Sequence, residues 1–438
     1  MDDSARRTAL AVIFLTVFID LLGFGMVLPL LPIYARHFTQ GFTPEQSGWI
    51  VGLLMASFSA MQFLFLPIWG RLSDRVGRRP IVLLGLAGSV VFYALFGFAT
   101  IWQSLVGLFV ARIGAGIAGA TIATAQAYIA DVTPRERRAA GMALIGAAFG
   151  LGFTLGPMIG GLSVLIGGGE FSPWPGFVAS GLSAGAFLLA WTRLPEPDRA
   201  AGSAQRSLFD LRALKAALAT PSVGLLILTS FLTVTAFASF ESTLSLSVAR
   251  LVEHFDAGEV DSALLGWLLA RFRDGSGKPS DNDVFLVVLV VFTYLGLTLT
   301  LAQGLLVRRL AKKLPEGTLA TAGLVVASVG LLLLAQAAIS HHFGLLLTAI
   351  TIEVIGFSLV TPPLQSLISR RSDPAQQGGI LGLGQSAASL SRILGPVLGI
   401  RLIADHPSWP YLVAAALMGV GFLLAQFAIR GGRDFPSA

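Results

Sequence analysis

The chain has 438 residues, of which only 30 Lys or Arg and 24 Asp or Glu carry a charge. This 12% share is about half of the roughly 25% usual in soluble domains, and 54% of the residues are hydrophobic. A soluble protein of this length cannot bury so much apolar surface, so the composition excludes a soluble enzyme. The same hydrophobicity excludes a disordered chain, and the absence of cysteine excludes a disulfide scaffold.

Twelve apolar runs are each long enough to cross a bilayer as a helix. In chain order they cover residues 8–31, 46–69, 80–99, 103–127, 139–166, 174–193, 222–248, 284–307, 317–339, 343–366, 376–403 and 409–430. The first run is too long for a signal peptide and no cleavage site follows it, so we expect it to remain as a span. No run alternates apolar and polar residues as a β-barrel would. The sequence therefore predicts an all-α membrane protein with twelve transmembrane helices.

The distribution of Lys and Arg predicts how these spans are oriented. Segments on the side of the N-terminus hold 22 of the 30 cations, whereas segments on the opposite side hold 5. Because short positive loops stay in the cytoplasm, we expect both termini there, in a multi-pass protein of the inner (plasma) membrane. The cations are spread over seven short segments, so the net charge of +6 does not predict a nucleic-acid partner.

The chain divides into two halves that resemble each other. Residues 1–193 and 222–438 each carry six spans, and residues 194–221 form a cytoplasmic linker between them. The turn at 70–80 has a basic counterpart at 304–314, and Leu155–Gly160 (LGPMIG) has a counterpart at Leu394–Gly399 (LGPVLG). These echoes predict two pseudo-symmetric six-helix bundles, an arrangement that places a substrate site between repeats near mid-membrane.

One outer segment of the second half, residues 249–283, is long and acidic. It holds seven Asp or Glu against four Lys or Arg, with a helix-like stretch at Val260–Phe272. We expect either a soluble lid or a surface that docks a partner.

Five charged residues fall inside apolar spans, where each ion costs at least about 2.5 kcal/mol. They are Asp20, Arg112, Glu241, Glu353 and Arg392. All except the shallower Glu241 lie near mid-membrane, which suggests one pair between Asp20 and Arg112 and another between Glu353 and Arg392. Such pairs can simply tie helices together. However, buried ion pairs rarely repay their desolvation, and a carboxylate that gains and loses a proton can couple proton flow to transport, so we favour proton coupling.

Four motifs of the N-terminal half form a recognisable set. They are Phe18–Gly25 with Pro29 and Pro32 in span 1; Gly70–Pro80 in the first inner loop; Arg112–Gly119 with Ala130–Pro134 in and after span 4; and Gly150–Gly161 in span 5. Together they resemble the major facilitator superfamily, and within it the twelve-span drug/proton antiporters, including the tetracycline/proton antiporters. The resemblance implies two six-helix bundles and proton-coupled efflux.

The chain departs from the tetracycline antiporters in span 3. Those proteins carry an Asp there, whereas this chain has Phe92-Tyr93, and its span 9 has no acidic residue. The departure argues against tetracycline itself as the substrate.

The first inner loop and the exit of span 4 predict a conformational latch. The residues concerned are Gly70, Asp74, Gly77, Arg78, Arg79 and Asp131. Glycine permits positive φ, Asp74 can sit at the N-terminus of a helix of the other half, and the arginines can bind Asp131 or lipid phosphates. Alternatively, Arg78 and Arg79 serve only to orient the protein in the membrane.

Small residues in spans 4 and 5 predict close helix packing. The antiporter-type span 5 carries Gly152, Gly156, Pro157 and Gly160, which suits either a bending point or plain packing. Gly114–Gly119 matches a dinucleotide-binding pattern, but it lies inside an apolar span, so we interpret it as a packing face.

Polar and aromatic side chains of several spans are candidates for lining a substrate cavity. They are Phe24, Gln62, Phe63, Gln126, Tyr128, Phe237, Gln365 and Gln385. Hydrogen bonding between helices is the alternative role for the polar ones, and contact with lipid is the alternative for the aromatic ones.

Taken together, these features predict a proton-coupled efflux antiporter of small amphipathic compounds or drugs. A proton-coupled symporter of a sugar or another small metabolite is the alternative. The five histidines fall at outer loops or span ends without metal-site spacing, so we expect no metal, no cofactor and no enzyme. The expected partners are a small-molecule substrate, protons and the lipid bilayer, with the protein a monomer.

If the inner loop is a latch, Asp74→Asn should leave membrane insertion intact and reduce transport, because orientation requires the arginines but not this carboxylate. Membrane fractionation and an efflux assay measure the two effects. Normal turnover in the variant would contradict the latch.

Overall fold

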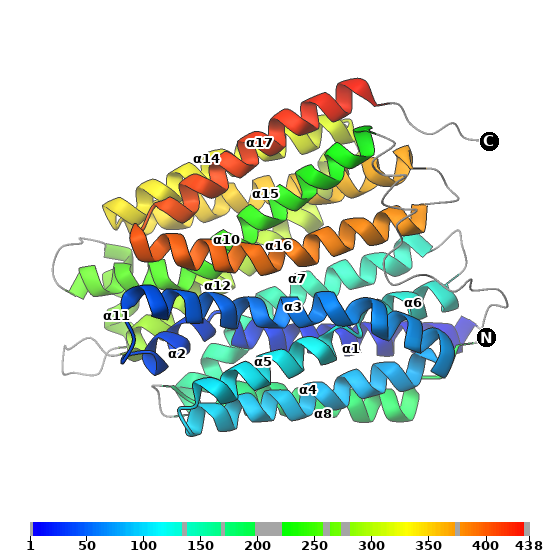
Figure 1. Cartoon of the computed structure of the whole chain (residues 1–438), viewed down its shortest axis with the longest axis horizontal. Coiled ribbons are helices and arrows are strands. Elements are labelled where there is room, and N and C mark those ends of the chain that lie inside the picture. The colour runs from blue at the N-terminus through cyan, green and yellow to red at the C-terminus, as the bar shows by residue number, and fades with distance from the viewer. Residues whose placement is uncertain are drawn as a thin grey trace. The chain divides into compact units, whose positions relative to one another are not determined.

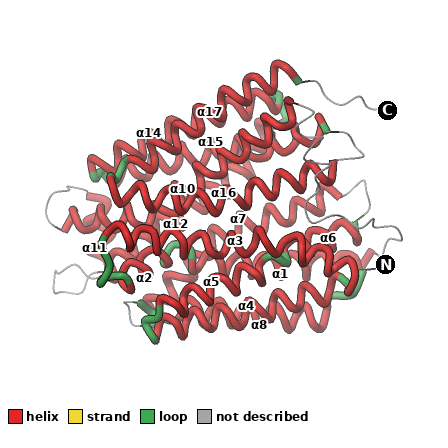
Figure 2. The backbone as a smooth tube through the Cα atoms, viewed as in Figure 1, coloured by secondary structure: helices red, strands yellow, loops and turns green. Residues whose placement is uncertain are grey.

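The computed structural model describes residues 3–133, 138–167, 171–197, 221–256, 263–272, 281–372 and 377–432. Every regular element in these ranges is a helix, as Figure 2 shows. Most of the predicted linker, and residues 257–262 and 273–280 of the acidic outer segment, lie outside the described residues. In lipid every backbone polar group must find a partner within the chain, and a helix meets this requirement within a single segment.

The chain forms two compact units, described separately here. Unit 1 comprises Met1–Gly41 and Ser57–Leu208, and unit 2 comprises Phe42–Ala56 and Phe209–Ala438. Helix α3 (Pro44–Val76) contributes to both. The other helices of unit 1 are α1 (Asp3–Val27), α2 (Leu31–Phe38), α4 (Arg78–Ile101), α5 (Leu105–Gly119), α6 (Ile122–Val132), α7 (Arg138–Ile166) and α8 (Trp174–Arg193), coloured blue to green in Figure 1.

Unit 2 holds the helices coloured green to red in Figure 1. They are α10 (Pro221–Asp256), α11 (Ala263–Phe272), α12 (Asp281–Leu301) with a π-helical turn at Ala302–Val307, α13 (Arg308–Leu310), α14 (Glu316–Ser340), α15 (Phe343–Arg371), α16 (Gln377–Asp405) and α17 (Trp409–Gly431). Part of the acidic outer segment is therefore helical, because α10 continues to Asp256 and α11 follows it.

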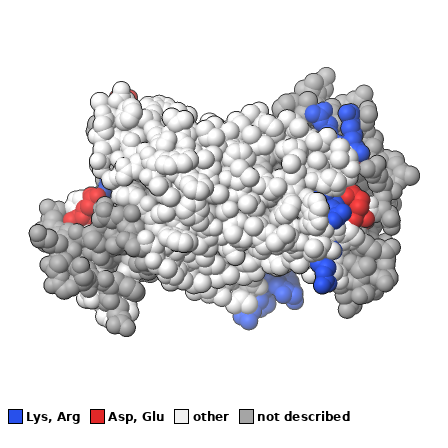
Figure 3. All heavy atoms as spheres, turned by 90° about the horizontal axis from the view of Figure 1, so that it is seen from below, with Lys and Arg blue, Asp and Glu red and all other residues white. Residues whose placement is uncertain are grey.

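Eleven helices among the described residues are long and apolar enough to cross a membrane. A shorter apolar stretch, Gly150–Val164, lies in α7, where the fifth of the twelve spans was predicted. The face drawn in Figure 3 shows mostly uncharged residues, with few Lys, Arg, Asp or Glu spheres. A broad uncharged surface is suited to contact with lipid.

A stripe of glycines brings α7 against α1 in unit 1. A Cβ atom at Gly152 would lie 2.9 Å from the Cβ of Leu21, and one at Gly156 would lie 2.8 Å from the Cα of Gly25. At Gly160 a Cβ would lie 2.7 Å from the carbonyl oxygen of Met26. These contacts support packing as the role of the span 5 glycines, since a larger side chain would push the two backbones apart.

The second half repeats this contact with the matching residues of its own motif. Gly395 and Gly399 of α16 face α10, where a Cβ would lie 2.6 Å from the Cβ of Ala238 and 2.7 Å from the Oγ of Ser239, respectively. The LGPMIG and LGPVLG motifs therefore make the equivalent contact in their own units. Elsewhere, Gly114 packs against the ring of Phe92 and Gly116 against Phe58, which confirms the packing face predicted for span 4.

Enlarging a glycine of this stripe should destabilise the protein. Gly156→Leu and Gly395→Leu should each cost about 1–3 kcal/mol or more, because the neighbouring group belongs to another helix and cannot swing away. The thermal transition of the purified protein measures the effect. Gly181→Leu is the matched control, because nothing lies within 4 Å of a Cβ at this position. Equal transitions for Gly156→Leu and Gly181→Leu would contradict the packing role.

Candidate functional site

Asp20, the acidic residue inside the apolar stretch of α1, is held by side chains of α4. The Ser89 hydroxyl donates to Asp20 Oδ1 at 2.8 Å, and the Tyr93 hydroxyl donates to the Asp20 carbonyl oxygen at 3.4 Å. Tyr93 also packs against α1, since a Cβ at Gly23 would lie 2.8 Å from its ring. The span 3 tyrosine that marked a departure from the tetracycline antiporters is thus a neighbour of Asp20.

Arg112 of α5 is 2% exposed and lies among aromatic rings. Its guanidinium carbon is 4.7 Å from the centre of the Phe58 ring and 5.6 Å from that of Phe24. The Nε and Nη1 atoms are buried without hydrogen-bond partners. Cation–π contacts compensate only part of the cost of burying this charge, so the site retains unused donor capacity.

No ion pair joins Asp20 to Arg112 in the part of the chain that the structure describes, although we expected one. The Asp20 carboxylate accepts a hydrogen bond from Ser89 instead, and the Arg112 guanidinium packs on the Phe58 ring. The Tyr93 side chain lies near both groups and donates to the backbone carbonyl of Asp20. The position of Asp20 and Arg112 along their spans predicted that both lie near mid-membrane, but it did not predict which side chains contact them.

A second buried charge cluster lies in unit 2. Glu353 of α15 is fully buried, and neither of its carboxylate oxygens has a hydrogen-bond partner. Glu241 of α10 interacts electrostatically with Glu353 and also with Arg392 of α16. The expected ion pair between Glu353 and Arg392 is absent from the described residues, and Glu241 is the acidic residue with which Arg392 interacts.

The inner turn of unit 1 holds a network of charges. Helix α3 continues to Val76 and α4 begins at Arg78, so Gly70 and Asp74 are helical and only Gly77 forms the turn. Arg78 pairs with Asp74 at 2.6 Å and with Asp131 of α6 at 2.9 Å. The contact predicted between the motif arginines and Asp131 is therefore formed, while the latch role stays a prediction.

Glu196, which follows α8, completes this network and was missed in the sequence. Its two carboxylate oxygens accept the backbone N–H groups of Arg78 and Arg79 at 2.6 and 3.0 Å. Gly77 between the helices has a φ of 120°, and a Cβ there would lie 2.9 Å from Glu196 Oε1. A negative charge at the N-terminus of α4 is favoured by the helix dipole.

The residues proposed for a substrate cavity have different surroundings. The Gln62 amide donates to the Gly119 carbonyl at 3.3 Å, and the hydroxyl of the fully buried Tyr128 donates to the Pro195 carbonyl at 2.8 Å. Both bonds are internal, in agreement with the alternative role of tying segments together.

The aromatic candidates belong to ring clusters within each unit. The Phe24 ring centre lies 4.8 Å from that of Phe58, and the Phe237 ring centre lies 4.0 Å from that of Phe357. Phe63 and Gln126 are partly buried, while Gln365 and Gln385 are exposed. A cavity role for all these residues remains a prediction.

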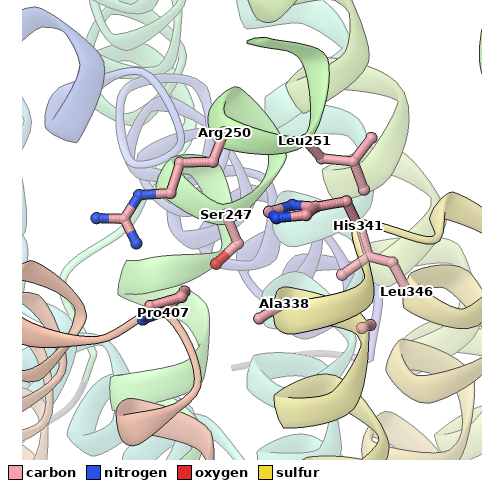
Figure 4. A pocket seen from close by; sticks show the side chains of 8 residues that line it. Ser247, Arg250, Leu251, Ala338, His341, Leu346 and Pro407 are labelled. Carbon is pink, nitrogen blue, oxygen red and sulfur yellow. The ribbon is translucent and has the colours of Figure 1, made fainter. Parts of the chain in front are cut away.

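A small pocket lies among α10, α14, α15 and the segment before α17 (Figure 4). Its space of about 10 Å³ suffices for no more than one water molecule. Ser247 is hydrogen-bonded to Tyr411 at 2.6 Å, Arg250 donates to the Ile403 carbonyl at 3.0 Å, and His341 stacks on His254. In Figure 4 the Arg250 guanidinium points away from His341. The pocket is therefore too small to be a substrate site.

Among the described residues, no group of three or more His, Cys, Asp or Glu side chains is placed so that it could hold a metal ion. Of the five charged residues inside the spans, Arg112 and Glu353 are buried, and Asp20, Glu241 and Arg392 are partly buried.

Two units of apolar helices long enough to span a membrane, each with charges of both signs inside its spans, indicate a membrane transporter. The chain belongs to the Major Facilitator Superfamily, whose sequence model matches residues 13–303 and 284–437. The resemblance seen in the motifs is thereby confirmed, as is the all-α membrane fold. The chain is a transporter and not an enzyme.

Relatives of known name cover nearly the whole chain. The class C tetracycline resistance protein of Escherichia coli is 32% identical over 432 residues, which is 97% of each chain. The crystal structure of the human organic anion transporter MFSD10 (TETRAN) is 25% identical, has a TM-score of 0.67 and covers 97% of this chain and all of that one. A bacterial homologue of the human lysosomal transporter Spinster, inward-facing and unoccupied, is similar in fold, with a TM-score of 0.72, 13% identity and full coverage of both chains.

Removing the carboxylate of Glu196 should loosen the start of α4. In Glu196→Ala the amides of Arg78 and Arg79 should exchange with solvent about 5- to 30-fold faster, because a charged cap contributes about 1–2 kcal/mol. Hydrogen exchange read by mass spectrometry on peptides across residues 77–83 measures this. The control is Glu316→Ala, which removes an acid from the first turn of α14 in unit 2. Unchanged exchange in Glu196→Ala would show that the carboxylate does not hold the helix.

Proposed function

We propose that this transporter is a proton-coupled efflux antiporter of small amphipathic compounds. The observation that carries the proposal is the presence of carboxylates inside the bundles without a permanent cationic partner: Asp20 accepts a hydroxyl donor, and both oxygens of Glu353 lack any partner. A buried carboxylate that no arginine neutralises is most stable when protonated, so it can take up a proton from one side and release it on the other.

In this scheme Asp20, held by Ser89, is the principal proton carrier, and Arg112 is the second residue of the proton-coupling site. Glu241, Glu353 and Arg392 form a second titrating group in the C-terminal half. Protonation of Asp20 competes with substrate, and the halves 1–193 and 222–430 alternate in access to the two sides. Arg78, with Asp74 and Asp131, stabilises one of the two states through the inner turn.

Efflux as the direction is supported by the relatives. Several are tetracycline resistance proteins, and the chain shares with the drug/proton antiporters the Gly-Pro motif of span 5. We further propose that the protein works as a monomer in the inner membrane, with both termini in the cytoplasm, as the distribution of Lys and Arg predicts.

A second candidate function, a proton-coupled carrier of a small anionic metabolite, is favoured by one observation. Arg112 has two buried nitrogens, Nε and Nη1, whose N–H groups have no partner, and these suit an acceptor group on a substrate. MFSD10, at 25% identity, is described as an organic anion transporter.

Asp20→Asn should abolish concentrative transport while sparing downhill exchange, because the amide keeps the hydrogen bond to Ser89 but cannot carry a proton. Proteoliposomes with an imposed pH gradient measure both activities, with a fluorescent cationic dye as the probe. Asp20→Glu is the matched control and should retain gradient-driven accumulation. A variant Asp20→Asn that still concentrates the dye would overturn the assignment.

Dye accumulation, compared in cells with and without the protein, distinguishes the efflux antiporter from the carrier of an anionic metabolite. An efflux antiporter should lower steady-state dye accumulation, and this effect should disappear when the proton gradient is collapsed. Uptake of a labelled organic acid that depends on the proton gradient, without any change in dye content, would instead support the second candidate.

A further inference from the structure

The outward surface of unit 1 carries a groove between α4 and α8. It is lined by Pro80, Leu83, Leu84 and Ala87 of α4 and by Phe187 and Trp191 of α8, with Arg79 at one end, and it encloses about 440 Å³. Of the residues that line it, only Arg79 belongs to another predicted feature, the latch at the inner turn.

The walls of the groove are apolar and accessible. The Leu84 side chain is 51% exposed and Trp191 is 58% exposed. Both helices are long and apolar enough to cross the membrane, so hydrocarbon covers such a surface. From Arg79 to Ala87 the stripe rises about 12 Å along α4, close to the roughly 15 Å depth of one leaflet's hydrocarbon. The groove therefore has the length to hold an acyl chain aligned with the helices.

Arg79 supplies a positive charge where this chain would meet its headgroup. Its Nη2 donates to the Trp191 carbonyl at 2.5 Å, which fixes the guanidinium above the last turn of α8, and its Nε has no hydrogen-bond partner. No carboxylate pairs with the Arg79 side chain in the described ranges. Asp74 and Asp131 pair with Arg78, and Glu196 binds backbone N–H groups. Among the described residues, therefore, the Arg79 guanidinium forms no ion pair with a carboxylate.

Two neighbouring residues place this end of the groove at the membrane interface. Trp191 is an exposed tryptophan in the last turn of a spanning helix, the position that aromatic belts occupy. Arg193 follows in the same turn and is also exposed, so a second cation lies near the same level. An interfacial tryptophan beside cations is suited to a lipid headgroup that carries negative charge.

We propose that the groove between α4 and α8 is a binding site for an anionic phospholipid. One acyl chain lies along Leu84, Ala87 and Phe187, and the headgroup phosphate binds the Arg79 guanidinium. Phosphate accepts several charge-assisted hydrogen bonds from arginine, and the acyl chain covers apolar surface that the helices leave open. The inference is independent of whether the substrate is a drug or an anion.

The test compares two lipids with the same acyl chains, phosphatidylglycerol and phosphatidylcholine, on the purified full-length protein. Native mass spectrometry counts the lipids retained in each titration. The wild type should retain phosphatidylglycerol about fivefold better, the ratio expected from one arginine near the surface. Arg79→Gln should remove this preference and Arg79→Lys should keep most of it. Arg193→Gln, which removes the second cation at this level but no residue of the groove lining, should reduce the preference much less than Arg79→Gln does.

A second pair of variants tests the acyl chain separately from the charge. Ala87→Trp fills the groove and should reduce retention of both lipids, whereas Val91→Trp, at a 60% exposed position further along α4, should not. Excess inorganic phosphate should fail to displace phosphatidylglycerol, because it has no chain to occupy the groove. The proposal is overturned if Arg79→Gln keeps the preference, if Ala87→Trp binds as Val91→Trp does, or if free phosphate competes. The Ala87 and phosphate arms keep the test decisive if Arg79→Gln fails to fold.

Discussion

The cost of placing a charge in hydrocarbon is the constraint on which the rest of this molecule depends. It confines most Lys, Arg, Asp and Glu residues to turns and span ends, and it requires the spans themselves to be helices. The five exceptions are distributed between both halves, on α1 and α5 in unit 1 and on α10, α15 and α16 in unit 2. Simple ion pairs would have reduced their cost. Instead, Asp20 accepts a hydroxyl donor, Arg112 lies on aromatic rings and Glu353 has no partner. Such a set is costly for a static bundle and appropriate to a carrier whose charges change partners.

Close helix packing provides the frame for these charges, and the chain uses the same device twice. Glycines of α7 meet α1, and the equivalent glycines of α16 meet α10. In each half, therefore, the first helix, which carries an acidic residue (Asp20 or Glu241), is fixed against a helix with a Gly-Pro motif. At the inner turn, Glu196 connects the start of α4 to the chain leaving α8, and Tyr128 secures the adjoining Pro195. The beginning of the linker is thus bound to the turn that carries the residues predicted to form a latch.

Three features could be predicted from the sequence: the spans, the repeat and the family. Each rests on a property of single segments, namely apolar length, charge at the ends or a local motif. The partners of individual side chains could not be predicted in this way. The position of each residue along its span placed Asp20 and Arg112 at the same depth. Whether two such side chains meet depends on how each helix is rotated about its axis, and their neighbours Ser89, Tyr93 and Phe58 come from other helices.

Glu196 was missed because its hydrogen-bond donors are backbone N–H groups, which no residue type in the sequence reveals. An acid between two prolines directly after a span was the available signal. The inner motif also predicted a loop, whereas α3 and α4 continue to either side of Gly77.

The central claim is that substrate and protons cross the membrane in opposite directions, with the protons carried by the carboxylates inside the spans. Proteoliposomes that enclose a pH indicator and are preloaded with a transported cationic dye test it most directly, with the membrane potential clamped. As the dye leaves down its gradient, antiport draws protons inward, so the account predicts acidification of the lumen that requires the protein. An alkaline shift would indicate symport, and an unchanged lumen during dye exit would show uncoupled transport; either result would contradict the account.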